Sequence, residues 1–313
     1  MKSAKKTPLS PKVVALDGDF EHQFVHARGI RLHVATAGNP QNPLVLLLHD
    51  GLGGWFDFKD VLGPLAQRGW YAVALDMRGY GMSDKPPNSY DHRHATGDLA
   101  GVIRSLGHER AHLFGAGSGA SIAWLFAAVY PDHVHSLTSI GAIHPLDVRR
   151  AIAQRPWLFG DTLPFTLHYR LPRFLQRMRP RFRQRLIERD LRNRTAKDFH
   201  HQPAFHQALE LRKQAAHIGN TLPAREKTVR YVVNVPPVSW ATLKVHCPVF
   251  LLTDPGAQSL VFLRRATSRV RQNLSSLSVV TGRLPHIEQP EEFVRLLDRI
   301  LHSVVDLPST SER

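Results

Sequence analysis

The stretch Leu113-Phe114-Gly115-Ala116-Gly117-Ser118-Gly119-Ala120 decides the fold. It predicts a short apolar strand over residues 111–114 that enters a glycine-rich turn, and then a helix over residues 118–130 that Pro131 helps to end. Gly115 and Gly119 would let a strand and a helix pass closely, and Gly117 tolerates the positive φ that so sharp a turn requires. The centre of the turn therefore offers no side chain that could attack a substrate, although Ser118 follows one residue later.

Apolar runs typical of buried strands alternate with helical patterns on both sides of this turn. We expect further strands over residues 20–25, 30–37, 44–48, 71–75, 135–140, 249–253 and 277–280. Helices are expected over residues 58–68 and 94–106, and from Pro290 onward, where apolar residues recur at a helical period. Strands that alternate with helices across short loops predict an α/β fold with a mostly parallel sheet flanked by helices.

The strand signal stops between residues 145 and 239. This segment has a helical pattern, is basic and is interrupted by several prolines, so we interpret it as an inserted helical lid, or cap. The core is then expected to comprise residues 19–144 and 240–305. Residues 1–18 are predicted to be a disordered or loosely attached basic segment, and residues 306–313 a tail.

The composition limits the class of protein. Apolar residues make up 42% of the 313 residues, enough for a large core, and the single cysteine, Cys247, excludes an internal disulfide framework. The basic N-terminus lacks the apolar stretch of a secretory signal, and no run of about 18 apolar residues could span a membrane. These features favour a cytoplasmic protein.

The net charge of +15 is concentrated in the middle of the chain. Residues 149–230 hold 19 Lys and Arg against 6 Asp and Glu, with the densest run of arginines between Arg170 and Arg194. This pattern fits a solvated helical face, or a surface for an anionic partner such as a membrane or an acidic protein. No pattern indicates specific recognition of nucleic acid, and the oligomeric state is left open.

Five segments together resemble the α/β-hydrolase superfamily, in the branch of the epoxide hydrolases and haloalkane dehalogenases. The matching segments are the oxyanion loop at residues 49–55, the D-x-R-G-x-G-x-S-D-K-P signature at 76–86, the nucleophile elbow at 115–120, the N-x-P-H-P segment at 141–145 and the catalytic-histidine segment at 282–290. The resemblance covers nearly the whole chain.

The resemblance implies roles for individual residues. His286 falls at the catalytic histidine, the general base. Gly51 and Ser118 fall at the two backbone N–H donors of the oxyanion hole, and Gly117 falls at the nucleophile. The carboxylate that pairs with the histidine falls at Asp254 if the loop after the strand is two or three residues shorter than in the family. An alignment without a gap would instead place Ala257 there. We prefer Asp254.

The remaining implied positions concern the substrate. Trp55 occupies the family's usual tryptophan in the oxyanion loop. Tyr169 resembles the lid tyrosine that polarises an epoxide oxygen, and Tyr231 is a second candidate. No metal or cofactor is implied. Asp50 departs from the family's glycine, and its charge would oppose a developing anion unless it points away.

Three hypotheses remain. In the first, the protein is a hydrolase of a small apolar ester or epoxide, in which His286 activates water or Ser118 replaces the lost nucleophile. In the second, it is an inactive pseudo-hydrolase that binds a ligand, or docks on a partner or membrane through its basic cap. In the third, it is a lyase or isomerase that uses His286 alone.

Overall fold

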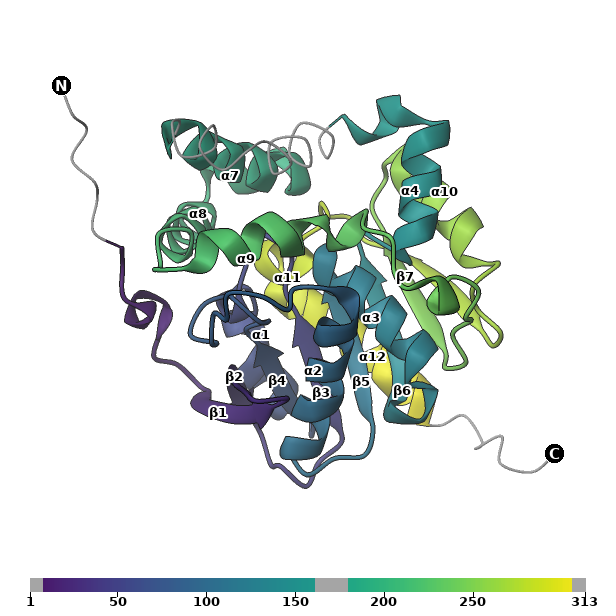
Figure 1. Cartoon of the computed structure of the whole chain (residues 1–313), viewed down its shortest axis with the longest axis horizontal. Coiled ribbons are helices and arrows are strands. Elements are labelled where there is room, and N and C mark those ends of the chain that lie inside the picture. Colours follow the sequence, from purple (N-terminus) through teal and green to yellow (C-terminus); the bar gives the residue numbers. More distant parts are fainter. Residues whose placement is uncertain (1–7, 161–179, 306–313) are drawn as a thin grey trace.

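The computed structural model describes residues 8–160 and 180–305, arranged around one central sheet (Figure 1). The sheet has eight strands in the order β1-β2-β4-β3-β5-β6-β7-β8. They are β1 (Glu21–Ala27), β2 (Ile30–Ala37), β3 (Leu44–Leu48), β4 (Tyr71–Leu75), β5 (Ala111–Ala116), β6 (Val134–Ile140), β7 (Val249–Thr253) and β8 (Leu274–Ser278). β2 is antiparallel to both of its neighbours, and all other neighbouring strands are parallel. The predicted α/β class is confirmed.

Helices cover both faces of this sheet. α1 (Lys59–Ala66) and α12 (Pro290–Val305) pack on one face, while α2 (His92–Ser105) and α3 (Ser118–Val129) pack on the other. Every residue of β3 is buried, and its side chains alternate between the two resulting cores: Leu44, Leu46 and Leu48 join the α2–α3 side, and Val45 and Leu47 the α1–α12 side. A strand covered on both faces needs such a continuous apolar run.

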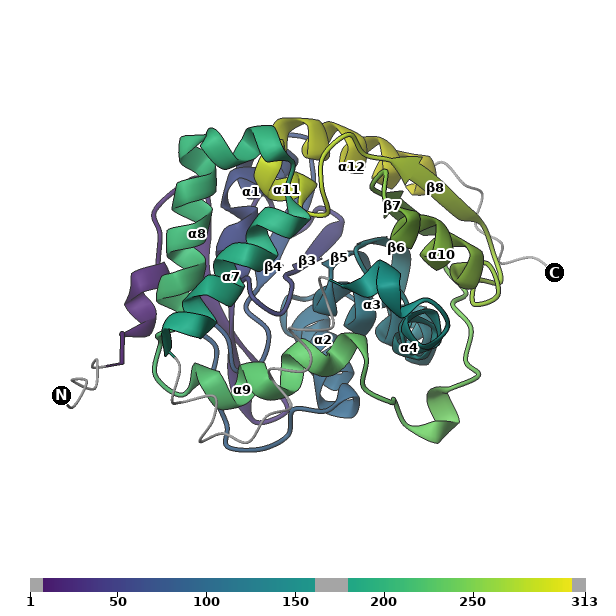
Figure 2. The ribbon, with the colours of Figure 1, turned by 90° about the horizontal axis from the view of Figure 1, so that it is seen from above.

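A helical region lies over one end of the strands. Between β6 and β7 the described chain contains helices and turns but no strand. Its elements are α4 (Pro145–Gln154), η4 (Pro156–Phe159), α7 (Pro180–Arg194), η5 (Lys197–His201), α8 (Pro203–Ala215), α9 (Thr221–Thr228), η6 (Val229–Val232) and η7 (Val238–Trp240). We call residues 145–239 the cap. Seen from above, α7, α8 and α9 lie on one side of the strand ends, and α4 lies on the other beside α10 (Ala257–Ala266) (Figure 2).

The segment before β1 corrects the sequence prediction. Residues 8–18 are ordered rather than loosely attached, and they include the 3-10 turn η1 (Pro11–Val14). Leu9 exchanges backbone hydrogen bonds with the cap at His217 and Gly219, and Val14 is fully buried. The segment is held because its apolar residues and backbone groups join the cap to the core, contacts that its composition does not reveal.

The last strand also departs from the prediction. β8 begins three residues earlier than expected, at Leu274, because it is an edge strand whose exposed serines carry little apolar pattern. None of the helices within the described ranges is long and apolar enough to cross a membrane.

Candidate functional site

The glycine-rich turn between β5 and α3 has the geometry that its glycines predict. Gly117 has a φ of 51° and a ψ of −114°, in the left-handed half of backbone space that favours glycine. A Cβ on Gly115 would lie 2.6 Å from the backbone nitrogen of Ala120, and one on Gly119 would lie 2.5 Å from the carbonyl oxygen of His49. The turn is therefore sharp, and side chains are excluded where β3, β5 and α3 approach each other.

A guanidinium group from the cap fills the space that a side chain at Gly117 would enter. A Cβ built on Gly117 would lie 2.7 Å from Nη2 of Arg194 and 3.1 Å from Cβ of Asp50. Arg194 is the last residue of α7, and its Nη1 donates to Oδ2 of Asp50 at 2.5 Å. The cap thus places a positive charge against the bend of the turn.

Asp50 belongs to a buried network of opposite charges that joins the core to the cap. Its Oδ1 accepts hydrogen bonds from the backbone N–H groups of Leu52 and Gly53 at 2.7 and 2.8 Å, and its Oδ2 lies 3.4 Å from Nη1 of Arg212. Burial disfavours the charged form of Asp50, but Arg212 and Arg194 hold its pKa below the usual range. The extra carboxylate in the oxyanion loop is therefore neutralised by two cap arginines.

Two further carboxylates complete the network. Asp57 pairs with Nη2 of Arg212 at 2.8 Å, and Asp190 lies 3.5 Å from Nη1 of Arg194. Burial raises the pKa of Asp57 to about 6 and also raises that of Asp190, against the attraction of the arginines. Burial therefore makes both carboxyl groups easier to protonate than an exposed aspartate.

A small cavity lies between the turn and the cap. Its volume is about 70 Å³. The described residues that line it are Gly51, Leu52, Gly117, Ser118, Gly141, Val148, Phe159, Asp190, Arg194, Val229, Val232, Gln258, Phe262 and Arg283. One water needs about 10–15 Å³ of such space, and a cavity of about 150 Å³ can hold benzene. The described walls thus enclose room for a few waters or for a ligand smaller than benzene.

Three residues expected at the site, Gly51, Gly117 and Ser118, meet in this cavity. The backbone N–H groups of Gly51 and Ser118 donate no hydrogen bond to a described residue. Oγ of Ser118 is buried and also has no hydrogen-bond partner there, and it faces Gly51, whose Cβ would lie 3.3 Å away. The hydroxyl points towards the oxyanion loop, and Ser118 lines the described cavity.

His286 lies behind the turn in an aromatic cage. It sits in α11 (Pro285–Glu288), stacks on Phe58 with ring centroids 4.7 Å apart, and contacts Phe114 and Phe293 edge-on. Neither ring nitrogen has a hydrogen-bond partner among the described residues. Burial, followed by Arg212 and Arg194, lowers its pKa to about 3. The imidazole is neutral at pH 7, is a weak base, and is not among the described residues lining the cavity.

The expected carboxylate partner of His286 is engaged elsewhere. Asp254 follows β7 and accepts a hydrogen bond from the hydroxyl of Ser259 in the first turn of α10. This is the role of a turn-forming Asp-Pro-Gly before a helix. Ala257, the alternative position, is the first residue of that helix and carries no carboxylate. The pairing of Asp254 with His286 is therefore absent from the described hydrogen bonds.

The other expected substrate-binding residues do not join the cavity. Trp55 is fully buried, and its indole N–H donates to the carbonyl of Val14 at 3.0 Å, so it anchors the N-terminal segment. Tyr231 packs on His92, away from the described cavity lining. Tyr169 lies outside the described residues.

The loop before His286 is clamped to the end of α7. The backbone N–H of Arg283 donates to the carbonyl of Arg194 at 2.7 Å, and Oε2 of Glu288 accepts from the N–H of Ala196 at 2.8 Å. A Cβ on Gly282 would collide with the carbonyl oxygen of Arg194. These contacts fix the backbone at Arg194, and the hydrogen bond to Asp50 holds its guanidinium.

Comparison with known proteins agrees with this architecture. The family model described as "alpha/beta hydrolase fold" matches residues 43–218, more than half of the chain. The chain belongs to the α/β-hydrolase family. Its sharp turn between β5 and α3 carries Gly117 at the bend, and the Arg194 guanidinium fills the space beside it.

Several relatives of this α/β-hydrolase are epoxide hydrolases. It is 34% identical over 154 residues to epoxide hydrolase B of Mycobacterium tuberculosis, a match covering 48% of this chain and 43% of the relative. It is 38% identical over 154 residues to the AB hydrolase superfamily protein YfhM of Bacillus subtilis, covering 48% and 53%. The matches thus span about half the length of these curated relatives. The structure of epoxide hydrolase A from Mycobacterium thermoresistibile superposes with a TM-score of 0.72 at 21% identity, covering 90% and 98% of the two chains.

Sequence reasoning missed the arginines that define this site. Arg194 was assigned to a basic surface run, and Arg212 was not singled out. One signal could have found Arg194: it follows the buried Ile187 and Leu191 at helical spacing on the inner face of α7. An arginine on an apolar face near an unexpected aspartate, Asp50, indicates a buried ion pair.

Proposed function

We propose that this epoxide hydrolase-like α/β-hydrolase binds a small ligand beneath its cap and does not hydrolyse esters or epoxides. One observation carries the proposal: the nucleophile position is Gly117, and the Arg194 guanidinium occupies the space beside it. A covalent route needs an attacking atom at that point. Here the guanidinium of Arg194, a hydrogen-bond donor with a positive charge, occupies that point instead.

The hydrolase hypotheses have less support. Direct activation of water by His286 would use a base whose pKa is lowered to about 3 and whose ring nitrogens lack a carboxylate partner. Covalent attack by Ser118 would need a base within hydrogen-bond reach, and its Oγ has no partner among the described residues. A lyase or isomerase relying on His286 alone would use the same weak base.

Turnover measurements test this proposal. The full chain should not convert styrene oxide or p-nitrophenyl acetate above the rate of a His286→Ala variant. That variant is matched because it leaves the cap, the elbow and Arg194 unchanged. Hydrolysis by the wild type that is lost in His286→Ala would overturn the proposal and restore the water-activation hypothesis.

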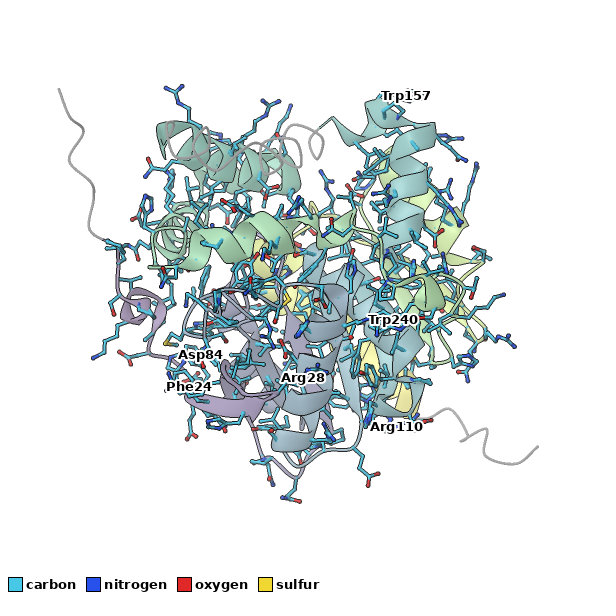
Figure 3. The ribbon with its side chains drawn as sticks, viewed as in Figure 1. Phe24, Arg28, Asp84, Arg110, Trp157 and Trp240 are labelled. Carbon is cyan, nitrogen blue, oxygen red and sulfur yellow. The ribbon has the colours of Figure 1, made fainter. Side chains whose placement is uncertain are left out.

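A second role, docking of the cap on an anionic membrane, is favoured by one surface feature. Trp157, in η4, is 73% exposed and projects from the upper edge of the molecule (Figure 3). Exposed Arg155 lies two residues before it in the chain, and exposed Arg185 and Arg189 lie on α7; none of the three forms an ion pair with a described residue. Exposed tryptophan with arginine suits the boundary between lipid headgroups and acyl chains.

Vesicle pelleting tests the docking role. The chain should pellet with vesicles containing phosphatidylserine, less so at high salt, and weakly with phosphatidylcholine alone. Trp157→Ala and the double variant R185Q/R189Q should each reduce pelleting. Equal pelleting with neutral vesicles, or no effect of these variants, would contradict this role.

A further inference from the structure

A chain of hydrogen-bonding contacts runs from the buried Asp76 to the segment before β1. Nδ1 of His33 lies 2.8 Å from Oδ2 of Asp76, and Nε2 of His33 lies 2.8 Å from Nδ1 of His22. Nε2 of His22 in turn lies 2.8 Å from the carbonyl oxygen of Leu16. Every ring nitrogen of the two histidines therefore takes part, and each of the three contacts needs one proton between its two atoms.

The pair holds one proton more than two neutral imidazoles carry. A neutral imidazole has one N–H group, so two such rings supply two protons for three contacts. The carbonyl of Leu16 can only accept. The carboxyl of Asp76 is ionised: burial favours its protonated form, but the hydrogen bond and charge of His33 hold its pKa below the usual range. Its oxygens also accept from the N–H groups of Trp55 and Met82. One of the two rings is therefore an imidazolium, whichever of them carries the extra proton.

The ring orientations that this count requires are held by packing. His22 packs edge-on against Trp55 with ring centroids 4.8 Å apart, and the side chain of His33 is fully buried. The nearby His49 needs no extra proton, because its Nδ1 contacts the carbonyl oxygen of Asp50 at 2.6 Å while its Nε2 accepts from a backbone N–H at 3.1 Å. One neutral ring satisfies both of those contacts. The extra proton thus belongs to His22 and His33.

The other titratable groups around the pair are engaged elsewhere. Nζ of Lys85 donates to two backbone carbonyls, and Asp84 pairs with Arg31. At the cap end of the segment, Nδ1 of His217 contacts the carbonyl oxygen of Lys213. Three acidic residues beside the pair in the chain are exposed and form no ion pair with a described histidine: Asp17, Asp19 and Glu21. Asp76 is therefore the carboxylate that balances the extra proton.

Loss of the extra proton breaks the contact at the exposed end of the chain. Two protons then remain, and they stay on the contacts at Asp76 and at the buried Nε2 of His33, because a buried group without a partner is costly. Nε2 of His22 is left without a proton and faces the carbonyl oxygen of Leu16, another acceptor. We propose that His22 and His33 form a proton-dependent clasp, which holds residues 8–18 on the core and releases Leu16 when the extra proton leaves.

The clasp makes the attachment of the N-terminal segment, and through it of the cap, depend on pH. Leu9 in this segment exchanges backbone hydrogen bonds with His217 and Gly219 of the cap. Because the folded pair binds its extra proton opposite Asp76, the clasp stabilises the fold at low pH, and this contribution is lost as the pH rises. Unfolded histidines lose their protons near pH 6.5, so the contribution is complete below about that pH. Residues 8–18 should therefore be held most firmly in mildly acidic solution.

Hydrogen exchange of the full chain between pH 6 and pH 8.5 tests the clasp. The protection of residues 8–18, corrected for the chemical exchange rate at each pH, should fall about tenfold over this range, because a hydrogen bond to a charged group is lost. His22→Gln cannot carry the extra proton and should abolish this fall. The matched control is His26→Gln, which replaces an exposed histidine of the same strand without a described side-chain hydrogen bond and should retain the fall.

Nitrogen NMR spectra of the histidine rings provide a second measurement. At pH 6 the wild type should show one imidazolium shared by His22 and His33, and the His22 signals are identified by their loss in His22→Gln. Two neutral rings at pH 6, unchanged protection of residues 8–18, or an equal fall in His22→Gln and His26→Gln would each overturn the proposal. Circular dichroism checks the fold of each variant, and the wild-type spectra decide the matter if His22→Gln unfolds.

Discussion

Replacing Arg194 with methionine should destabilise the fold, because it leaves Asp50 buried with one partner fewer. Removing one member of a buried ion pair typically costs about 3–5 kcal/mol. Asp50 would retain Arg212 at 3.4 Å and two backbone N–H donors, so we expect the lower end, about 3 kcal/mol. At about 2.1 cal/mol/K per residue, a chain of 313 residues has an unfolding entropy of about 0.66 kcal/mol/K. The expected fall in Tm is therefore about 5 °C.

Thermal unfolding followed by circular dichroism measures this change, with Arg189→Met as the control. Arg189 is exposed on the same helix, so its replacement should change stability by no more than about 0.5 kcal/mol. Asp50→Asn and the double variant D50N/R194M complete a cycle in which the pair should couple by about 1–3 kcal/mol. If Arg194→Met unfolds at the same temperature as Arg189→Met, the guanidinium of Arg194 does not form the buried ion pair with Asp50.

Three further changes probe the elbow, the caged histidine and the clamp. Gly117→Asp should give no turnover of styrene oxide, because the new carboxylate would meet the guanidinium of Arg194 and His286 lacks a partner; product above the wild-type background would count against this reasoning. His286→Leu should leave stability unchanged or raise it by up to about 2 kcal/mol in urea titrations, because it removes two unsatisfied buried nitrogens; a clear loss would indicate a hidden partner. Glu288 has a pKa raised by burial to about 7, above its ordinary 4.5, so its stabilising contribution is complete below about pH 4.5 and is lost as the pH rises through 7. Glu288→Gln should therefore gain Tm relative to the wild type between pH 6 and pH 8.5, and a constant difference across that range would contradict the assignment.

The buried strands and the glycine-rich turn can be predicted from the sequence, because they depend on local residue patterns. The apolar run of β3 and the glycines at 115, 117 and 119 determine a buried strand and a sharp turn through burial and backbone geometry alone. The same patterns place Gly51 and Ser118 beside each other, because the ends of neighbouring parallel strands meet at one edge of the sheet.

The side-chain interactions within the site cannot be predicted from the sequence, because they form between segments that lie far apart in the chain. Asp50 and Arg194 lie 144 residues apart, and only the docking of the cap brings them together. Asp254 could serve equally as a catalytic carboxylate or a turn former, and its choice of Ser259 depends on the loop geometry. Trp55 anchors the N-terminal segment because its indole N–H donates to the carbonyl of Val14. No sequence pattern in that segment predicts that it is ordered.

The position of the Arg194 guanidinium is the most direct test of this account. A crystal structure of the full chain would show it. We expect Nη1 on Asp50 and Nη2 against the bend at Gly117. An Arg194 side chain turned out to solvent, with a water molecule bridging the open elbow and His286, would contradict the account and favour a hydrolase.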